Sequence, residues 1–166
     1  MCDHEKKYYF AYGKNMDSQK LSERCKEKKM PEDVIQKIIH SRQKGLLNGY
    51  SIVFNKKADS GNTVYSNIEN NNDDFVEGVL YNYDSDEFIK CLDKWECYPS
   101  HYEQKIVEVK TNDDEIIKAI VYVANREKIV ENLKPKKTYI EHLLKAKDLL
   151  SKEYWDKLKK IWDQAI

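Results

Sequence analysis

The segment best suited to binding chemistry is a short loop that follows a run of aromatic residues near the start of the chain. Residues 8–12 read Tyr-Tyr-Phe-Ala-Tyr, a β-favouring run, and Gly13, Lys14 and Asn15 follow directly. Glycine adopts backbone conformations that other residues avoid, and asparagine tolerates left-handed geometry, so consecutive N–H groups in such a turn can point at one anion. A helix-start pattern at Asp17 would add the free N–H groups of a helix N-terminus to this anion-binding turn. The pattern predicts an anion-binding loop, although an ordinary strand-to-helix turn has the same signature.

A second candidate is the carboxylate of Glu96, which lies in the segment LDKWECYPSHY at 92–102. Trp95, Tyr98 and Tyr102 surround it in sequence. Partial desolvation by such neighbours raises the pKa of a glutamate toward the range in which a general base works near neutral pH. The local sequence also fits a surface glutamate that follows a helix and pairs with a nearby lysine. Both interpretations stand on the local residues alone.

The two segments, together with motifs between them, resemble the γ-glutamylcyclotransferase family. The usual family pattern is YFAYGSN(M/L) near the start, then EGVLY, then LD-x-x-EGYP-x-x-Y. This chain has YFAYGKNM at 9–16, EGVLY at 77–81 and LDKWECYPSHY at 92–102. The resemblance extends to residues 48–55, to 66–68 and to Tyr139, and it covers most of the chain from residue 8 to about 154. Two departures stand inside the motifs: Lys14 replaces the usual serine, and Cys97 replaces the usual glycine.

The resemblance implies a reaction in which the substrate's own α-amine attacks its γ-carbonyl. This attack forms 5-oxoproline and expels the amine that was attached, with no cofactor and no covalent enzyme intermediate. The enzyme must hold the substrate in a ring-closing pose, accept a proton from the amine, stabilise an oxyanion and protonate the departing nitrogen. Glu96 matches the family's catalytic glutamate and could serve both proton transfers. The small γ-glutamyl substrate would be bound by Tyr9, Phe10, Ala11, Tyr12, Gly13, Lys14, Asn15, Tyr102 and Tyr139.

The two departures leave alternatives open. If the loop recognises substrate through backbone amides, Lys14 adds a cation near the substrate carboxylate, whereas a direct role for the usual serine hydroxyl would be lost. Cys97 raises the possibility of a thiol nucleophile beside Glu96. A neighbouring carboxylate disfavours the thiolate, and the sequence places no histidine closer than His101, four residues on. Cys97 also lacks the backbone freedom of glycine, which puts the geometry of this turn in question.

Composition excludes several classes of function. The 29 basic residues balance the 29 acidic ones, so there is no general attraction for nucleic acid or for an anionic membrane. No apolar run approaches 18 residues, and residues 1–7 lack the apolar centre of a secretion signal, so we expect a cytoplasmic protein with a single domain over residues 1–166. Cys2, Cys25, Cys91 and Cys97 have no zinc-site spacing and should be free thiols, and the scattered histidines suggest no metal ligand. Nothing in the sequence indicates the oligomeric state.

Alternation and turn signals predict an α+β fold, namely a small, mostly antiparallel β-barrel with flanking helices. Strands are expected near 8–12, 46–55, 63–68, 75–83, 102–110 and 116–124, and helices at 17–29, 31–40, 85–94, 138–150 and 152–164. Residues 59–62 and 111–115 look like hairpin turns, and the polar stretch 69–74 looks like a loop. In the last helix Tyr154, Trp155, Leu158, Ile161 and Trp162 share one face, which indicates core packing.

Three functions therefore remain at the level of sequence. The first is a γ-glutamylcyclotransferase-like enzyme with Glu96 as general acid and base. The second is a non-catalytic binding or interaction protein that keeps the fold, a possibility raised by Lys14 and Cys97. The third is an amidotransferase or lyase that uses the same carboxylate on a different amide. The sequence does not select among γ-glutamyl substrates.

Overall fold

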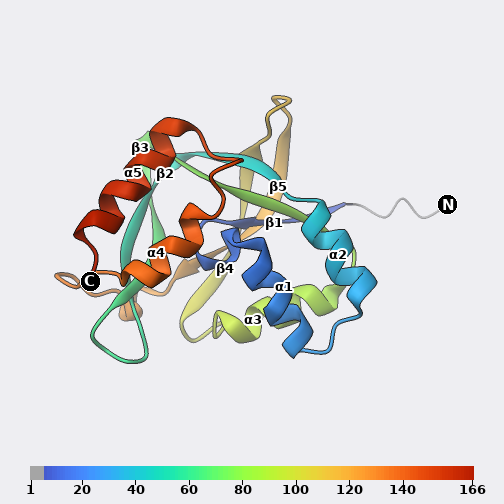
Figure 1. Cartoon of the computed structure of the whole chain (residues 1–166), viewed down its shortest axis with the longest axis horizontal. Helices are drawn as coiled ribbons and strands as arrows, with labels where there is room; N and C mark the ends of the chain where they lie inside the picture. The colour runs from blue at the N-terminus through green and yellow to red at the C-terminus, as the bar shows by residue number, and fades with distance from the viewer. Residues whose placement is uncertain (1–5) are drawn as a thin grey trace.

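A closed barrel of five strands forms the centre of the computed structural model, which describes residues 6–166. The strands are β1 (Lys7–Ala11), β2 (Gln43–Lys57), β3 (Val64–Tyr83), β4 (Tyr102–Lys110) and β5 (Ile116–Ala124). Around the barrel their order is β1-β3-β2-β4-β5 (Figure 1). All the neighbouring pairs are antiparallel except the closing pair, in which Tyr9 of β1 lies parallel to Ile120 of β5. The predicted barrel, mostly antiparallel, is confirmed.

The inside of the barrel is packed around the ring of Phe10, which is fully buried. Gly45 and Gly78 face each other in register across β2 and β3. A Cβ atom on Gly78 would lie 2.8 Å from the Phe10 ring, and one on Gly45 would lie 3.0 Å from it. Contacts this short are not tolerated in close-packed interiors. The glycine of the EGVLY motif therefore makes room for the aromatic residue of the first motif.

The polar stretch 69–74, predicted to be a loop, instead belongs to the long strand β3, so this prediction was wrong. The partner strand explains the difference. Asn70 pairs with Tyr50 and Phe75 pairs with Asn48, and the intervening residues form an irregularity opposite Gly49, whose φ is +86°. β3 therefore continues on both sides of the bulge because β2 pairs with it at Glu69 and Asn70 and again at Phe75.

Five α-helices surround the barrel in the described part of the chain: α1 (Ser18–Glu27), α2 (Glu32–His40), α3 (Asp86–Trp95), α4 (Lys137–Leu144) and α5 (Lys152–Gln164). Two short 3-10 helices, η1 (Lys14–Met16) and η2 (Arg126–Lys128), complete the set. In Figure 1, α4 and α5 cover the left side of the barrel, and α1, α2 and α3 gather at the lower right. The expected helix starts are confirmed at α1 and α3, where the side chains of Asp17 and Ser85 accept capping hydrogen bonds.

Helix α4 is shorter than predicted and ends at Leu144 rather than near residue 150. The chain then makes successive turns in which Ala146 and Leu150 pack into the core. Its direction is set by a buried carboxylate on the barrel, because Glu77 of β3 accepts hydrogen bonds from Ser151 N at 2.7 Å and Ser151 Oγ at 2.5 Å. Ser151 is also the N-cap of α5. A contact with a distant strand therefore fixes the residue at which α5 begins.

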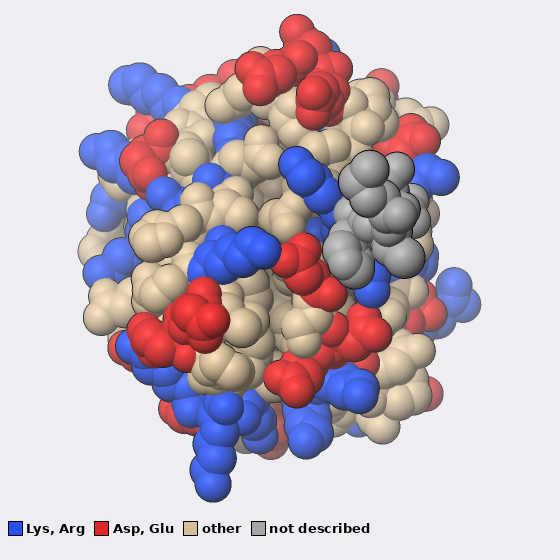
Figure 2. Space-filling view, turned by 90° about the vertical axis from the view of Figure 1, so that its right-hand side faces the viewer, with Lys and Arg blue, Asp and Glu red and all other residues tan. Residues whose placement is uncertain are grey.

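The aromatic stripe of α5 is largely core, as predicted, because Tyr154 and Leu158 are buried and Trp155 and Ile161 pack partly against them. Cys25, Cys91 and Cys97 are free thiols, whereas Cys2 lies outside the described residues. None of the described helices is long and apolar enough to cross a membrane. Figure 2 shows basic and acidic side chains interspersed over the face that it displays, in keeping with the balanced composition.

Candidate active site

A pocket of about 210 Å³ brings the two sequence motifs together. Its walls come from the end of β1 with η1, the end of α3 with the turn that follows, the β2–β3 hairpin and the start of α4. Nine of the ten predicted site residues line it: Tyr9, Phe10, Tyr12, Gly13, Lys14, Asn15, Glu96, Tyr102 and Tyr139. Ala11, the tenth, does not line the pocket, because it is 1% exposed and pairs with Val79 across β1 and β3.

Glu96 is held in the pocket by the way α3 ends. It is the C-cap residue of that helix. The N–H of Tyr98 donates to the Asp93 carbonyl at 2.8 Å, and the N–H of Cys97 donates to the Lys94 carbonyl at 3.3 Å. These two bonds define a Schellman motif, whose left-handed position falls on Cys97 with φ +49°. The turn geometry that the cysteine put in question is thus kept, and Cys97 occupies a position that favours glycine.

The turn is anchored to the barrel by Asp93, one helical turn before Cys97. Its Oδ1 accepts hydrogen bonds from the Tyr122 hydroxyl at 2.7 Å and from the Gln104 side-chain amide. Tyr122 and Gln104 belong to β5 and β4. This structural role for the aspartate of the LD-x-x-E segment means that the backbone preceding Glu96 is fixed from two strands.

The electrostatic environment of Glu96 suits proton transfer. The side chain is partly buried, and burial raises the pKa of its carboxyl to about 7, while Arg24 and Lys56 partly oppose this rise. Within residues 6–166 its carboxylate makes no hydrogen bond and no ion pair at close range. A carboxylate that is unpaired, lines a pocket and titrates near neutrality can both accept and return a proton.

Gly13 is required for close packing rather than for an unusual φ, which is −120° here. A Cβ atom at this position would lie 2.4 Å from Ser66 Oγ and 2.9 Å from the Tyr139 hydroxyl oxygen. That hydroxyl also bonds to Ser66 Oγ at 2.7 Å and accepts from Ser66 N at 3.2 Å. The main chain of the loop is therefore pressed against a Ser66–Tyr139 pair that joins β3 to α4.

Asn15 does not adopt the left-handed geometry that asparagine tolerates, because it lies within the 3-10 helix η1. Its side chain instead organises the pocket. Asn15 Nδ2 donates to the Tyr9 hydroxyl at 3.2 Å, and Asn15 Oδ1 accepts from Arg24 Nη1 at 2.9 Å. The first amides of the turn, those of Gly13, Lys14 and Asn15, donate to no other group among residues 6–166, which leaves them available to a bound molecule.

The pocket tyrosines have protein partners for their hydroxyl groups. Tyr12 donates to the Tyr122 carbonyl, and Tyr102 donates to the Ser66 carbonyl at 3.2 Å. Burial raises the pKa of Tyr139 to about 12 and raises those of Tyr12 and Tyr102 as well. These phenols are neutral near pH 7, so they shape the pocket and are not bases.

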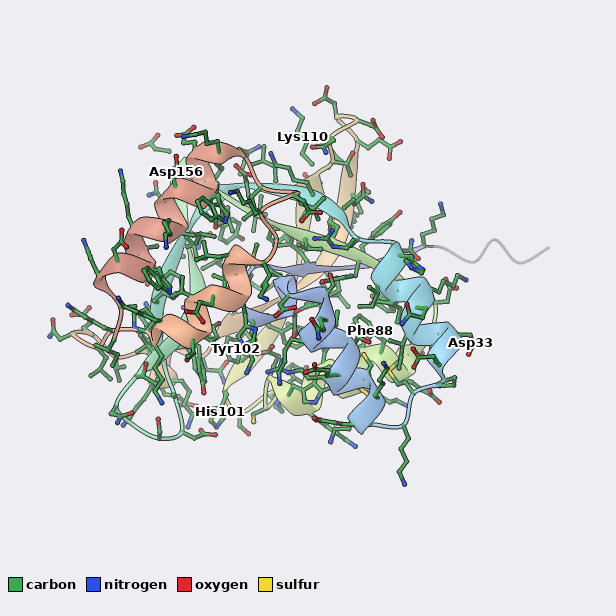
Figure 3. All side chains as sticks on the ribbon, in the orientation of Figure 1. Asp33, Phe88, His101, Tyr102, Lys110 and Asp156 are labelled. Carbon is green, nitrogen blue, oxygen red and sulfur yellow. The ribbon has the colours of Figure 1, made fainter. Side chains whose placement is uncertain are left out.

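Sequence reasoning missed several cations and polar groups in the wall. Arg24 stacks with its guanidinium 5.5 Å from the Trp95 ring centroid, and Lys56 Nζ lies 2.9 Å from His101 Nδ1. Figure 3 shows His101 and Tyr102 on the lower side of the molecule. In the sequence, Lys56 is one of two adjacent lysines at the end of a strand. Because neighbouring side chains of a strand point to opposite faces, the one available signal was that only one of the two lysines could face outward. Nine lining residues were not among the predicted site residues, although Ser66, Trp95, Cys97 and His101 lie in segments that the sequence analysis considered: Arg24, Lys56, Asp59, Tyr65, Ser66, Trp95, Cys97, His101 and Tyr122.

Fold and site together define a class of protein: a small closed barrel with one carboxylate of raised pKa in a pocket sized for a small molecule. The family pattern described as "Gamma-glutamyl cyclotransferase, AIG2-like" matches residues 9–148. The chain therefore belongs to this family, as the motifs predicted. A comparison with curated protein sequences gives no match.

Solved structures support the fold. One, described as a γ-glutamyl cyclotransferase, has a TM-score of 0.73 at 22% identity and covers 93% of this chain and 87% of its own. An uncharacterized protein from Homo sapiens has a TM-score of 0.74 at 22% identity, with 93% and 87% covered. A γ-glutamyl cyclotransferase specific to glutathione from yeast has a TM-score of 0.64 at 11% identity, with 96% of each chain covered. At these identities the matches establish the architecture.

Proposed function

We propose that this protein is a γ-glutamylcyclotransferase that releases 5-oxoproline and a free amine or amino acid from a small γ-glutamyl compound. The observation that carries the proposal is the placement of Glu96, an unpaired carboxylate that faces the same pocket as the Gly13 loop and has a pKa raised to about 7. Membership of the AIG2-like family supports the reaction class.

In the proposed reaction, Glu96 accepts a proton as the substrate's α-amine nitrogen bonds to the γ-carbonyl carbon. The bond between that carbon and the departing nitrogen then breaks, and Glu96 returns the proton to the departing nitrogen. The amides of Gly13, Lys14 and Asn15 are suited to hold the glutamyl carboxylate or the oxyanion, because they have no partner in the described chain. Every step uses groups of the substrate and of this pocket.

The test is to incubate the protein with a panel of γ-glutamyl dipeptides and γ-glutamylamines and to assay 5-oxoproline. We expect release from at least one compound and none from its N-acetylated form, because acetylation removes the attacking amine. Cys97→Ala should retain most activity per folded molecule, and no acyl-enzyme should appear in mass spectra. Cleavage of the acetylated substrate at the normal rate would indicate a nucleophile on the protein and would overturn the cyclisation mechanism. Binding without turnover of any compound would favour a non-catalytic binding protein.

A further inference from the structure

The pocket holds two separate groups of cations, and Glu96 is close to both. Arg24 and Lys14 line the side of the pocket formed by η1 and α1, where the charge of Arg24 contributes to lowering the pKa of Lys14 and Arg24 donates a hydrogen bond to Asn15. Lys56 lies on the side formed by the β2–β3 hairpin and the turn after α3, beside His101. The charges of Arg24 and Lys56 both reach Glu96, whereas neither Arg24 nor Lys14 is among the charges that act on Lys56. Arg24 on one side and Lys56 on the other therefore both act on Glu96, and all three side chains line the same pocket.

Lys56 is a buried charge without a fixed counter-ion. The residue is only 3% exposed, and within residues 6–166 no carboxylate lies within salt-bridge distance of its Nζ. Its ammonium contacts His101 Nδ1 at 2.9 Å and the ring faces of Tyr65 and Tyr102, whose centroids are 5.7 and 5.5 Å away. Asp59 is nearby, but its side chain is 85% exposed and its nearest basic partner is His101, at 3.8 Å.

Buried ammonium groups are costly unless they are paired, and an ammonium has three N–H donors. The contact with His101 uses one of them. Because Lys56 also lines the pocket, the remaining donors are placed to meet a group on a bound molecule. The chemistry that this site would recognise is an anion with oxygen acceptors, such as a carboxylate.

We propose that Lys56 binds a carboxylate on the leaving amine, so that the preferred substrates are γ-glutamyl α-amino acids rather than γ-glutamyl compounds of neutral or cationic amines. This inference rests on the proposed function. One carboxylate, that of the glutamyl group, would lie at the Lys14 and Arg24 side, and the second would lie at Lys56. The scissile amide between them would then face Glu96.

A different role for Lys56 must be separated from this one, because its charge also acts on Glu96. If Lys56 only adjusts the protonation of Glu96, its removal changes turnover of every γ-glutamyl substrate by the same factor. If it binds a leaving-group carboxylate, its removal changes the ratio between substrates that differ in that carboxylate alone. The ratio is therefore the decisive quantity.

The experiment compares γ-glutamylalanine with γ-glutamylethylamine, which differ only by the carboxylate of the leaving amine. For the unaltered protein we expect kcat/KM for 5-oxoproline release to favour γ-glutamylalanine by about tenfold or more, as for a hydrogen bond to a charged group. Lys56→Met should bring this ratio close to one. Lys57→Met, which neutralises the exposed neighbouring lysine outside the pocket wall, is the matched control and should preserve the ratio.

Equal kcat/KM for the two substrates with the unaltered protein would overturn the role of Lys56 while leaving the proposed reaction intact. A ratio that survives in folded Lys56→Met would do the same. If neither compound releases 5-oxoproline, calorimetric binding of both to the unaltered protein decides the matter separately from catalysis. Tighter binding of γ-glutamylalanine, lost in Lys56→Met, would still support the carboxylate site, and equal or absent binding would refute it.

Discussion

At the scale of single residues, burial and the lack of a close partner give Glu96 its character. An ordinary surface glutamate is ionised at neutral pH and is a weak base, whereas the carboxyl of Glu96 has a pKa raised to about 7 mainly by desolvation. The neighbouring aromatic residues in the sequence suggested this outcome. The cations that limit the rise, Arg24 and Lys56, come from other parts of the chain.

Replacement of Glu96 by glutamine tests its role in proton transfer. Glutamine keeps the shape but cannot accept a proton, so we expect kcat to fall by roughly two to four orders of magnitude with the fold intact. In the unaltered protein kcat/KM should rise with pH and level off above about 7, because the base acts in its ionised form. That inflection should be missing from the residual activity of Glu96→Gln. Near-normal turnover in a folded Glu96→Gln protein would rule out the mechanism.

Lys14 is a partly buried cation in the pocket wall, and burial together with Arg24 and Lys20 lowers its pKa. It leaves the pocket open, with about 210 Å³ free. If its ammonium helps hold the glutamyl carboxylate, Lys14→Ala should raise KM by about tenfold with little change in kcat. Steady-state kinetics of 5-oxoproline release measure both constants. An equal fall in kcat and kcat/KM would place Lys14 in transition-state stabilisation instead, and unchanged constants would show that it faces solvent.

At the scale of secondary-structure elements, the Schellman motif at the end of α3 connects stability to the site. Cys97 takes the left-handed conformation with φ +49°, which costs a non-glycine residue about 1 kcal/mol. The cysteine is therefore compatible with the turn but strains it. Glu96 remains in place because the two capping hydrogen bonds are backbone bonds that do not depend on the side chain at position 97.

Cys97→Gly should consequently stabilise the protein by about 1 kcal/mol in urea denaturation. Cys97→Ala keeps a Cβ atom at the same φ and should give no such gain, which makes it the control. Activity per folded molecule should change by less than about twofold in both variants, because the thiol has no part in the proposed chemistry. A glycine variant no more stable than the alanine variant would show that the turn carries no strain.

At the scale of the whole molecule, a buried carboxylate helps to attach the C-terminal helices to the barrel. Glu77 is 2% exposed, forms an ion pair with Lys44 at 3.1 Å and accepts both hydrogen bonds from Ser151. This cluster fixes the start of α5 against β3. Because α5 packs on α4, which carries Tyr139, it also supports one wall of the pocket.

Glu77→Ala should lower the free energy of unfolding by about 3 kcal/mol, since it leaves Lys44 and the N–H of Ser151 without their partner in a buried region. Glu69→Ala is the matched control on the same strand. Glu69 is exposed, and within residues 6–166 its side chain bonds only to Asn55, at 2.9 Å, so its loss should change stability by less than about 0.5 kcal/mol. Comparable effects of the two substitutions would contradict the role of Glu77.

The elements whose periodicity and caps are local could be predicted from the sequence, and its motifs predicted the family and half of the residues that line the pocket. β4, β5 and α5 have the predicted bounds, and Asp17 and Ser85 cap the helices that their positions predicted. The Gly13 loop and Glu96 line one pocket. These features are readable because each depends on residues that are near in sequence or belong to a recognisable motif.

The other features of the fold and the site depend on contacts between residues that are remote in sequence, so they are visible only in the folded chain. Glu69, Asn70 and Phe75 are held in β3 by pairing with β2 on both sides of the irregularity at 71–74, and α5 begins where Ser151 contacts Glu77 of the barrel. The field at Glu96 depends on Arg24 from α1 and Lys56 from β2, which no local pattern connects to the turn after α3. The folded chain buries the carboxyl of Glu96, which raises its pKa, and brings Arg24 and Lys56 into the same pocket, where their charges limit that rise.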